Sequence, residues 1–293
     1  MIEHLTLLFL DGVFVTTISE PIIAIILVTV GFAIGIAIGM SGIGAPMLFP
    51  ILILLGMPPQ AVVGTNLAFL AFTRIFTATN HAKNHHVDWK ALAIMIIPIV
   101  PSMFLGKIIW EYVEKTQGSQ VLDDMIFLLL GIIFMGLTFY LIKFHVLKKD
   151  FEHLDFISRD KSSMDSSHKQ SKRNPIIWLI TGGPISLIYQ ISGLGAVSMM
   201  LPVLVKTLHS PKIAAGTMAL FGVFAAFVGT TLHYSMDTIS FESLLFLLAG
   251  SIPGSIMGVK LVDKISARKL LFVFSLIIFF SGIFLLGKAI MSL

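Results

Sequence analysis

Two short glycine breaks are the parts of this sequence best suited to chemistry. Each has the form Ser-Gly-X-Gly-Ala inside an otherwise apolar run, at positions 41–45 and 192–196. Glycine costs about 1 kcal/mol in a helix interior, so the pattern predicts unwound backbone at both places. A helix that restarts after a break presents free N–H groups and a positive dipole end, which suit an anion. Close helix packing is the alternative. The candidate anion ligands are Ser41, Gly42, Gly44, Ser192, Gly193 and Gly195.

Four polar side chains that follow in apolar segments are further candidates. Thr65, Asn66 and Thr217 carry donors that could bind oxyanion oxygens. Hydrogen bonds between helices, worth about 0.6 kcal/mol each on average, are the alternative for these groups. Arg74 is the only arginine deep inside a predicted span, 62–79. A charge at that depth usually faces a transport pathway, although snorkelling to an interface is the alternative.

The titratable residues do not form an enzyme-like constellation. The sequence contains no recognisable nucleophile–base pair, carboxylate dyad or Walker sequence, so we expect neither an enzyme nor a cofactor. His81, His85, His86 and Asp88 are close together, but their basic loop favours a solvated turn over a metal site. His81 also matches His233 in a later segment, and histidine can relay protons near neutral pH.

The composition predicts the elements that must position these residues. Of 293 residues, 56% are hydrophobic and 12% are charged, whereas soluble chains carry about 25% charged residues. Backbone polar groups in lipid must be satisfied within the segment, so uncharged apolar runs are expected to be helices. The sequence therefore predicts an all-α polytopic membrane protein. The clearest runs are 22–40, 91–105, 126–142, 244–257 and 271–286.

An internal repeat organises the chain. Residues 31–106 align with 182–258 with one inserted residue. The matches fall largely on Gly, Pro, Thr and His, whereas chance apolar similarity would favour Leu and Ile. We therefore expect two homologous halves. The matching positions include Pro59 and Pro211, Gly64 and Gly216, Thr65 and Thr217, and His81 and His233.

Charge then predicts how the segments are divided and oriented. We expect an interfacial segment at 1–20, repeats at 21–146 and 175–293, and a polar linker at 147–174, whose Lys and Arg residues place it in the cytoplasm. The basic loop at 260–269 should also be cytoplasmic. That requires each broken segment to enter and leave on one side. The predicted fold is two inverted repeats, each a re-entrant hairpin plus three transmembrane helices. Eight spans in parallel halves are the alternative.

The motifs resemble a known family. The residues concerned are Gly-Met-Ser-Gly-Ile-Gly-Ala-Pro at 39–46, then Pro50, Pro59, Gly64-Thr65-Asn66 and Val87-Asp88-Trp89-Lys90. Their order and spacing resemble the sulfite exporter TauE/SafE family over roughly 28–287. Ile43 and Ala45 depart from a tract often richer in glycine, and Val197 stands where proline is usual. The resemblance implies transport of small sulfur-containing anions such as sulfite or sulfonates.

The combined expectation is a secondary transporter that exports such an anion across the cytoplasmic membrane by alternating access. No ATP-binding sequence is present, so a gradient of H⁺, Na⁺ or the anion itself must drive it. The expected partners are the small anion and the lipid bilayer. The formal charge of +4 requires no nucleic acid. An anion channel, or a transporter of another small carboxylate or oxyanion, is the alternative.

Overall fold

The computed structural model describes residues 20–41, 45–141, 175–194, 200, 204, 207–208, 211–261 and 267–292. Every regular element in these ranges is helical, which confirms the predicted all-α class. The elements are α2 (Glu20–Ser41), η1 (Ala45–Met47), α3 (Leu48–Leu54), α4 (Pro59–Lys83), α5 (Trp89–Ile96), α6 (Ile99–Gln117), α7 (Ser119–Leu141), α9 (Pro175–Ser192), α11 (Pro211–Ser235), α12 (Phe241–Leu261) and α13 (Ala267–Ser292).

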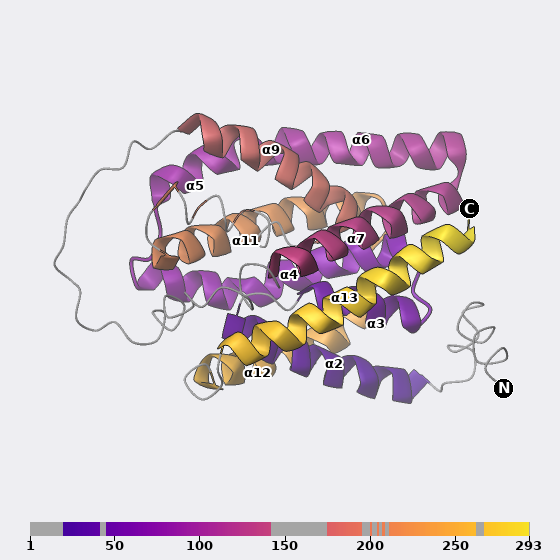
Figure 1. The fold of residues 1–293 in the computed structure, drawn as a ribbon, viewed down its shortest axis with the longest axis horizontal. Coiled ribbons are helices and arrows are strands. Elements are labelled where there is room, and N and C mark those ends of the chain that lie inside the picture. Colours follow the sequence, from indigo (N-terminus) through magenta and orange to yellow (C-terminus); the bar gives the residue numbers. More distant parts are fainter. Residues whose placement is uncertain are drawn as a thin grey trace.

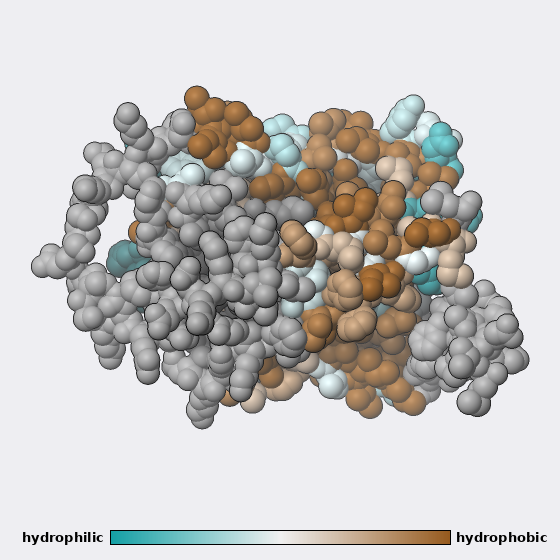
Figure 2. Space-filling view, in the orientation of Figure 1, coloured by the Kyte–Doolittle hydropathy of each residue, from teal (hydrophilic) through white to brown (hydrophobic). Residues whose placement is uncertain are grey.

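Apolar side chains cover much of the outside as well as the core. Six helical stretches within the described ranges are long and apolar enough to cross a bilayer. Ile25, Phe139, Leu245 and Phe280 are each more than 60% exposed, an arrangement suited to lipid contact. Figure 2 shows apolar residues over the middle of the visible surface, with several hydrophilic residues at the right-hand end of the view. The predicted polytopic membrane protein is confirmed.

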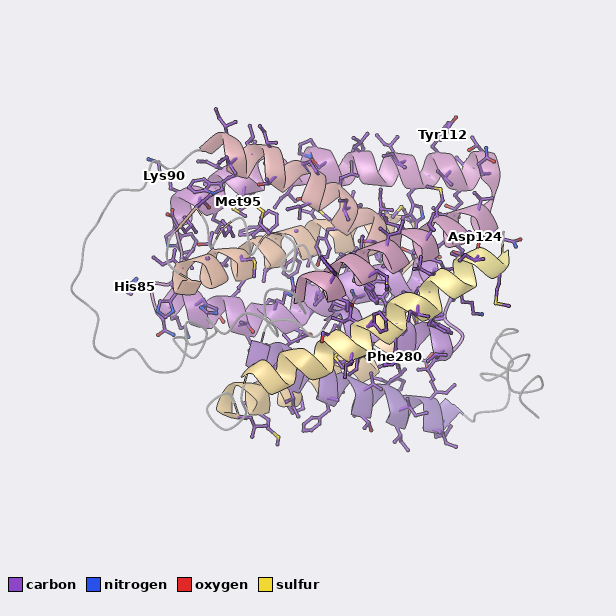
Figure 3. All side chains as sticks on the ribbon, viewed as in Figure 1. His85, Lys90, Met95, Tyr112, Asp124 and Phe280 are labelled. Carbon is purple, nitrogen blue, oxygen red and sulfur yellow. The ribbon has the colours of Figure 1, made fainter. Side chains whose placement is uncertain are left out.

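The bundle has two distinct ends. His85 and Lys90 lie at one end and Tyr112 and Asp124 lie at the other (Figure 3). We call them the His85 end and, after the α6–α7 turn, the Gly118 end. The long helices run between the two ends (Figure 1).

Helices α2 and α12 are pressed together along glycines. A Cβ added to Gly31, Gly35 or Gly39 would meet backbone atoms of α12, so the two helices pack closely along this stripe. Glycines 250, 254 and 258 of α12 are covered in the same way by α2. Residue numbers rise together along the contact, so the two helices run parallel. The facing pairs are Gly31–Leu247, Gly35–Ser251, Gly39–Ser255, Val28–Gly250, Phe32–Gly254 and Ile36–Gly258.

Helices α6 and α9 form a second parallel pair, on the opposite edge of the bundle from α2 and α12 (Figure 1). Gly182 faces Met95 and Pro98, and Gly106 faces Gln190. The pair Gly182–Met95 corresponds to Gly31–Leu247 under the repeat alignment (31 + 151 = 182; 95 + 152 = 247). Each half thus packs its first helix against a later helix of the other half.

Both broken segments return toward the end where they begin. Helix α2 runs parallel to α12, away from the Gly118 end. The chain is back at that end by Gln60, whose Nε2 donates to the Ser119 carbonyl over 3.4 Å. In the second half, Trp178 Nε1 donates to Thr207 Oγ1 over 3.0 Å. Thr207, which follows the second break, therefore lies beside the start of α9. These contacts fit the re-entrant interpretation. The inverted orientation of the halves remains a prediction.

Candidate functional site

Helices α4 and α11 form the centre of the molecule and carry four of the predicted ligands. They run antiparallel, because Leu67 faces Gly229 while His81 faces Gly216. The rings of Phe72 and Phe227 meet between these contacts at 6.1 Å. Thr65, Asn66 and Arg74 therefore lie along α4, and Thr217 lies near the start of α11.

Helix α9 ends at the second glycine break, where Gly193 is held by α4. Gly193 has φ +62°, and its N–H donates to the Tyr189 carbonyl over 2.8 Å. Asn66 Nδ2 donates to the Gly193 carbonyl over 2.8 Å. A Cβ at Gly193 would lie 3.0 Å from Phe49 Cζ, so both the backbone conformation and the space require glycine. The structure thus brings Asn66 and Gly193 together.

Ser192 is engaged locally. Its Oγ donates to the Ile188 carbonyl over 2.6 Å and accepts from the Leu194 N–H over 3.2 Å. The hydroxyl therefore satisfies backbone groups on both sides of the break.

Part of the predicted site lies outside the described residues. Gly42, Gly44 and Gly195 fall in undescribed positions, and Ser41 is described only as the last residue of α2. An anion held between the two breaks therefore stays a prediction.

The two threonines hydrogen-bond to turns rather than meeting each other. Thr65 Oγ1 accepts from the Ser240 N–H over 3.0 Å, and Thr217 Oγ1 accepts from the Asp88 N–H over 2.9 Å. Thr65 lies 16 residues from His81 (81 − 65 = 16), beside which α11 begins. At 1.5 Å per residue the two threonines are roughly 24 Å apart. Both threonines therefore make structural hydrogen bonds, the alternative to anion binding that the sequence left open.

The same turn geometry surrounds both threonines. Gly64 packs against Thr238, and Gly216 packs against the His86 carbonyl. The non-glycine residues with positive φ are His85, at 57°, and Asp237, at 55°, within the described chain. These positions differ by 152 residues (85 + 152 = 237; 86 + 152 = 238), as expected if the two halves share one local design.

Arg74 is enclosed by protein and does not snorkel. Arg74 is 4% exposed, and its Nη1 has no hydrogen-bond partner among the described residues. The one ion pair found among the described residues joins Lys107 to Glu111, so Arg74 forms none with them. Tyr189, near the end of α9, also has a buried hydroxyl without a hydrogen-bond partner among the described residues.

Sequence reasoning missed the polar residues that precede the second break. Both amide atoms of Gln190 are buried without a partner, where α6, α9 and α11 meet. The polar pair Tyr189-Gln190 at the end of an apolar run was the available signal.

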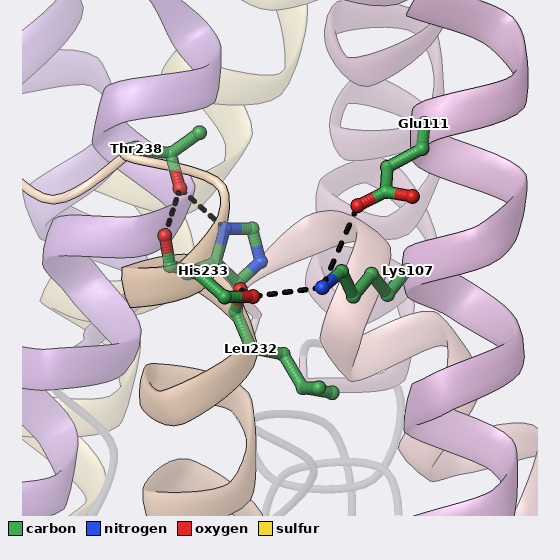
Figure 4. Close-up of polar contacts among 6 residues, drawn as sticks. Lys107, Glu111, Leu232, His233 and Thr238 are labelled. Carbon is green, nitrogen blue, oxygen red and sulfur yellow. Dashed lines mark hydrogen bonds and ion pairs between the residues drawn. The ribbon is translucent and has the colours of Figure 1, made fainter.

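His233, the matched histidine of the second half, is fully buried, and both nitrogens of its ring have hydrogen-bond partners; Figure 4 shows the contact with Thr238. Its Nδ1 lies 2.7 Å from Thr238 Oγ1, and its Nε2 lies 3.1 Å from the Gln190 carbonyl. Nearby, Lys107 Nζ donates to Ser235 Oγ over 2.8 Å and pairs with Glu111 at 3.5 Å.

The histidine-rich turn of the first half is organised as a helix cap. The Asp88 carboxylate accepts from the N–H groups of Lys90 and Ala91, over 3.1 and 3.0 Å, and so caps α5. The rings of His81 and His86 are 5.9 Å apart. Across the described residues, no three or more His, Asp or Glu side chains are grouped to hold a metal ion.

An apolar helical bundle with interlaced halves and a buried polar centre defines a multi-pass membrane protein. Residues 27–285 match the family described as Sulfite exporter TauE/SafE, and the chain belongs to that membrane transporter family. Among its relatives is the probable membrane transporter protein YjnA of Bacillus subtilis, 23% identical over 88% of this chain and 97% of the relative. Another is the probable membrane transporter protein MJ0441 of Methanocaldococcus jannaschii, 26% identical over 89% and 94%. No solved structure matches the chain significantly.

Proposed function

We propose that this protein is a secondary transporter that exports a small sulfur-containing anion, such as sulfite or a sulfonate, across the cytoplasmic membrane. The observation that carries the proposal is the family match over residues 27–285, which includes both broken segments. The polar centre agrees with it. A buried cation that forms no ion pair within the described residues and a helix that ends at a left-handed glycine suit an anion better than a neutral or cationic solute.

The arrangement of helices supports alternating access as the mechanism. Two parallel pairs, α2 with α12 and α6 with α9, lie on opposite edges of the bundle (Figure 1). Glycine contacts hold each pair tightly, so each is suited to move as a unit. Rocking one pair against the other around α4 and α11 would open the centre first to one side and then to the other. A gradient of H⁺, Na⁺ or the anion itself would drive the cycle.

Transport by the purified protein in liposomes tests the proposal. Vesicles loaded with ³⁵S-sulfite should lose label in a saturable, protein-dependent manner. External methanesulfonate or taurine should compete, whereas acetate should not. Protein-free vesicles provide the control for leakage.

Two results would contradict the proposal. Single-channel currents that carry the anion without saturation would identify a channel. Acetate flux that exceeds sulfite flux would identify a carboxylate transporter.

A further inference from the structure

Buried polar atoms without partners are concentrated on two helices. Of the eight such side-chain atoms found in the described residues, five lie on α4 or α9. They belong to Asn66, Arg74, Tyr189 and Gln190. Buried polar groups are nearly always paired in folded proteins, so this concentration marks a place where a ligand is expected.

Arg74 is the charged member of this set. An unpaired guanidinium inside a membrane protein is strongly unfavourable, and neighbouring carboxylates normally neutralise it. No described carboxylate forms an ion pair with Arg74. Gly193 joins the end of α9 to Asn66 of α4. Arg74 lies about two turns along α4 from this contact, and Tyr189 lies about one turn back along α9, both toward the His85 end. The buried Tyr189 hydroxyl is a second donor, and it has no acceptor among the described residues. A guanidinium nitrogen and a phenol hydroxyl, both buried and both without a partner in the described part of the chain, together match an anion that has at least two oxygens.

Neither side chain is repeated at the equivalent position of the other half of the molecule. Under the repeat alignment, Arg74 corresponds to Ala226 (74 + 152 = 226) and Tyr189 corresponds to Ile38 (189 − 151 = 38), both buried and apolar. A site built from these side chains therefore exists once per chain. Separate sites, one at each glycine break, would instead occur twice per chain.

We propose that Arg74 and Tyr189 bind the transported anion directly, as a singly charged oxyanion held once per chain between α4 and α9. The inference rests on the proposed transport function and names the residues that contact its substrate. One guanidinium balances one negative charge, so a sulfonate or hydrogen sulfite fits the site and the doubly charged sulfate does not.

Thermal unfolding and calorimetry of the full-length protein in detergent test the site. The probes are sulfite and methanesulfonate. Either probe should raise the Tm of the unmodified protein, because a ligand that binds only the folded state stabilises it. Arg74→Met should unfold at or above the unmodified Tm without ligand, since it removes an unpaired buried charge, and should show no rise with either probe. Tyr189→Phe should weaken the apparent Kd about fivefold, the loss expected for one hydrogen bond.

Lys107→Met is the matched control. It removes a cation from a membrane helix, but one that already has Glu111 and Ser235 as partners. This variant should keep the ligand-dependent rise in Tm. Calorimetry should give one anion per chain.

Three results would overturn the inference: an unchanged rise in Tm in Arg74→Met, two anions per chain, or no rise with either probe in the unmodified protein. The proposed function is tested separately. If Arg74→Met exports ³⁵S-sulfite as the unmodified protein does, the site is wrong and the function stands. If both probes stabilise the protein through Arg74 but liposomes export no sulfur-containing anion, the site stands and the function is wrong.

Discussion

Gly193 combines a left-handed backbone with a close neighbour, so even alanine should be strained there. Its φ is +62°, and an added Cβ would lie 3.2 Å from Val63 Cα. A non-glycine residue in this conformation costs about 1–2 kcal/mol before any clash. Gly193→Ala should therefore lower the free energy of unfolding by about 1–3 kcal/mol, measured as a Tm several degrees lower in detergent.

Gly136 provides the comparison for Gly193. It lies inside α7, and a Cβ there would meet nothing within 4 Å. Gly136→Ala should leave stability unchanged or raise it by up to about 1 kcal/mol, because alanine favours helix. If Gly193→Ala and Gly136→Ala lost the same stability, the backbone at Gly193 would not require glycine.

Thr65 and Thr217 provide a residue-scale test of structure against binding. Thr65→Val leaves the Ser240 N–H without its acceptor, and Thr217→Val does the same to Asp88. Each variant should lose about 1 kcal/mol of stability while its apparent Kd for sulfite stays unchanged. Thr65→Ser, which keeps the hydroxyl, should retain stability. A weaker Kd at unchanged Tm would instead make the threonines ligands.

The sequence revealed some of the central residues but not their partners. Gly193 and Arg74 are conspicuous because glycine and charge are unfavourable in an apolar span. The partner of Thr65 is 175 residues away and depends on tertiary packing, so no local pattern predicts it. Tyr189 is less conspicuous in the sequence, because a tyrosine ring is compatible with an apolar helix.

At the scale of elements, the α2–α12 contact should tolerate almost no added volume. Gly35 faces Ser251 and Gly254 faces Phe32, in both cases through backbone atoms that cannot rotate away. Gly35→Val and Gly254→Val should each separate the helices and destabilise the protein by about 1–3 kcal/mol or more. Size-exclusion profiles after graded heating would measure the loss.

Gly287, on α13, is the matched control for these substitutions. A Cβ added at Gly287 would meet nothing within 4 Å, so Gly287→Val should leave the profile nearly unchanged. Stable valine variants at Gly35 and Gly254 would show that the two helices can part without disrupting the fold.

The glycine stripe was predictable as a packing surface, but its partner was not. Spacing of four residues places Gly31, Gly35 and Gly39 on one helix face, which indicates close contact with some helix. Nothing local distinguishes α12 from the other apolar helices. The helix spans themselves followed from hydropathy, because lipid leaves the backbone few other conformations.

At the scale of the whole molecule, the two ends should face opposite sides of the membrane. The chain has no cysteine, so single substitutions give unambiguous labels. Gln117 and Asp237 are exposed at the Gly118 end, and Asn84 is exposed at the His85 end. In intact cells an impermeant maleimide should label Gln117→Cys and Asp237→Cys but not Asn84→Cys, because the basic linker is expected inside.

Permeabilised cells, in which all three cysteines should react, provide the control. Labelling of Asn84→Cys in intact cells would reverse the orientation. If only one of Gln117→Cys and Asp237→Cys were labelled, the two residues would not lie at the same end of the molecule.

The pairing of α2 with α12 has a consequence for how the protein is made. About 200 residues separate the end of α2 from the start of α12 (241 − 41 = 200), and ribosomes add roughly 5–20 residues per second. Helix α2 is therefore synthesised about 10–40 s before α12. During this interval its glycine face lacks its partner helix, so we expect lipid or the insertion machinery to cover it. Neither half should be able to mature by itself. Two fragments divided within 147–174 and expressed separately should be degraded, whereas their co-expression should restore a stable, co-purifying pair.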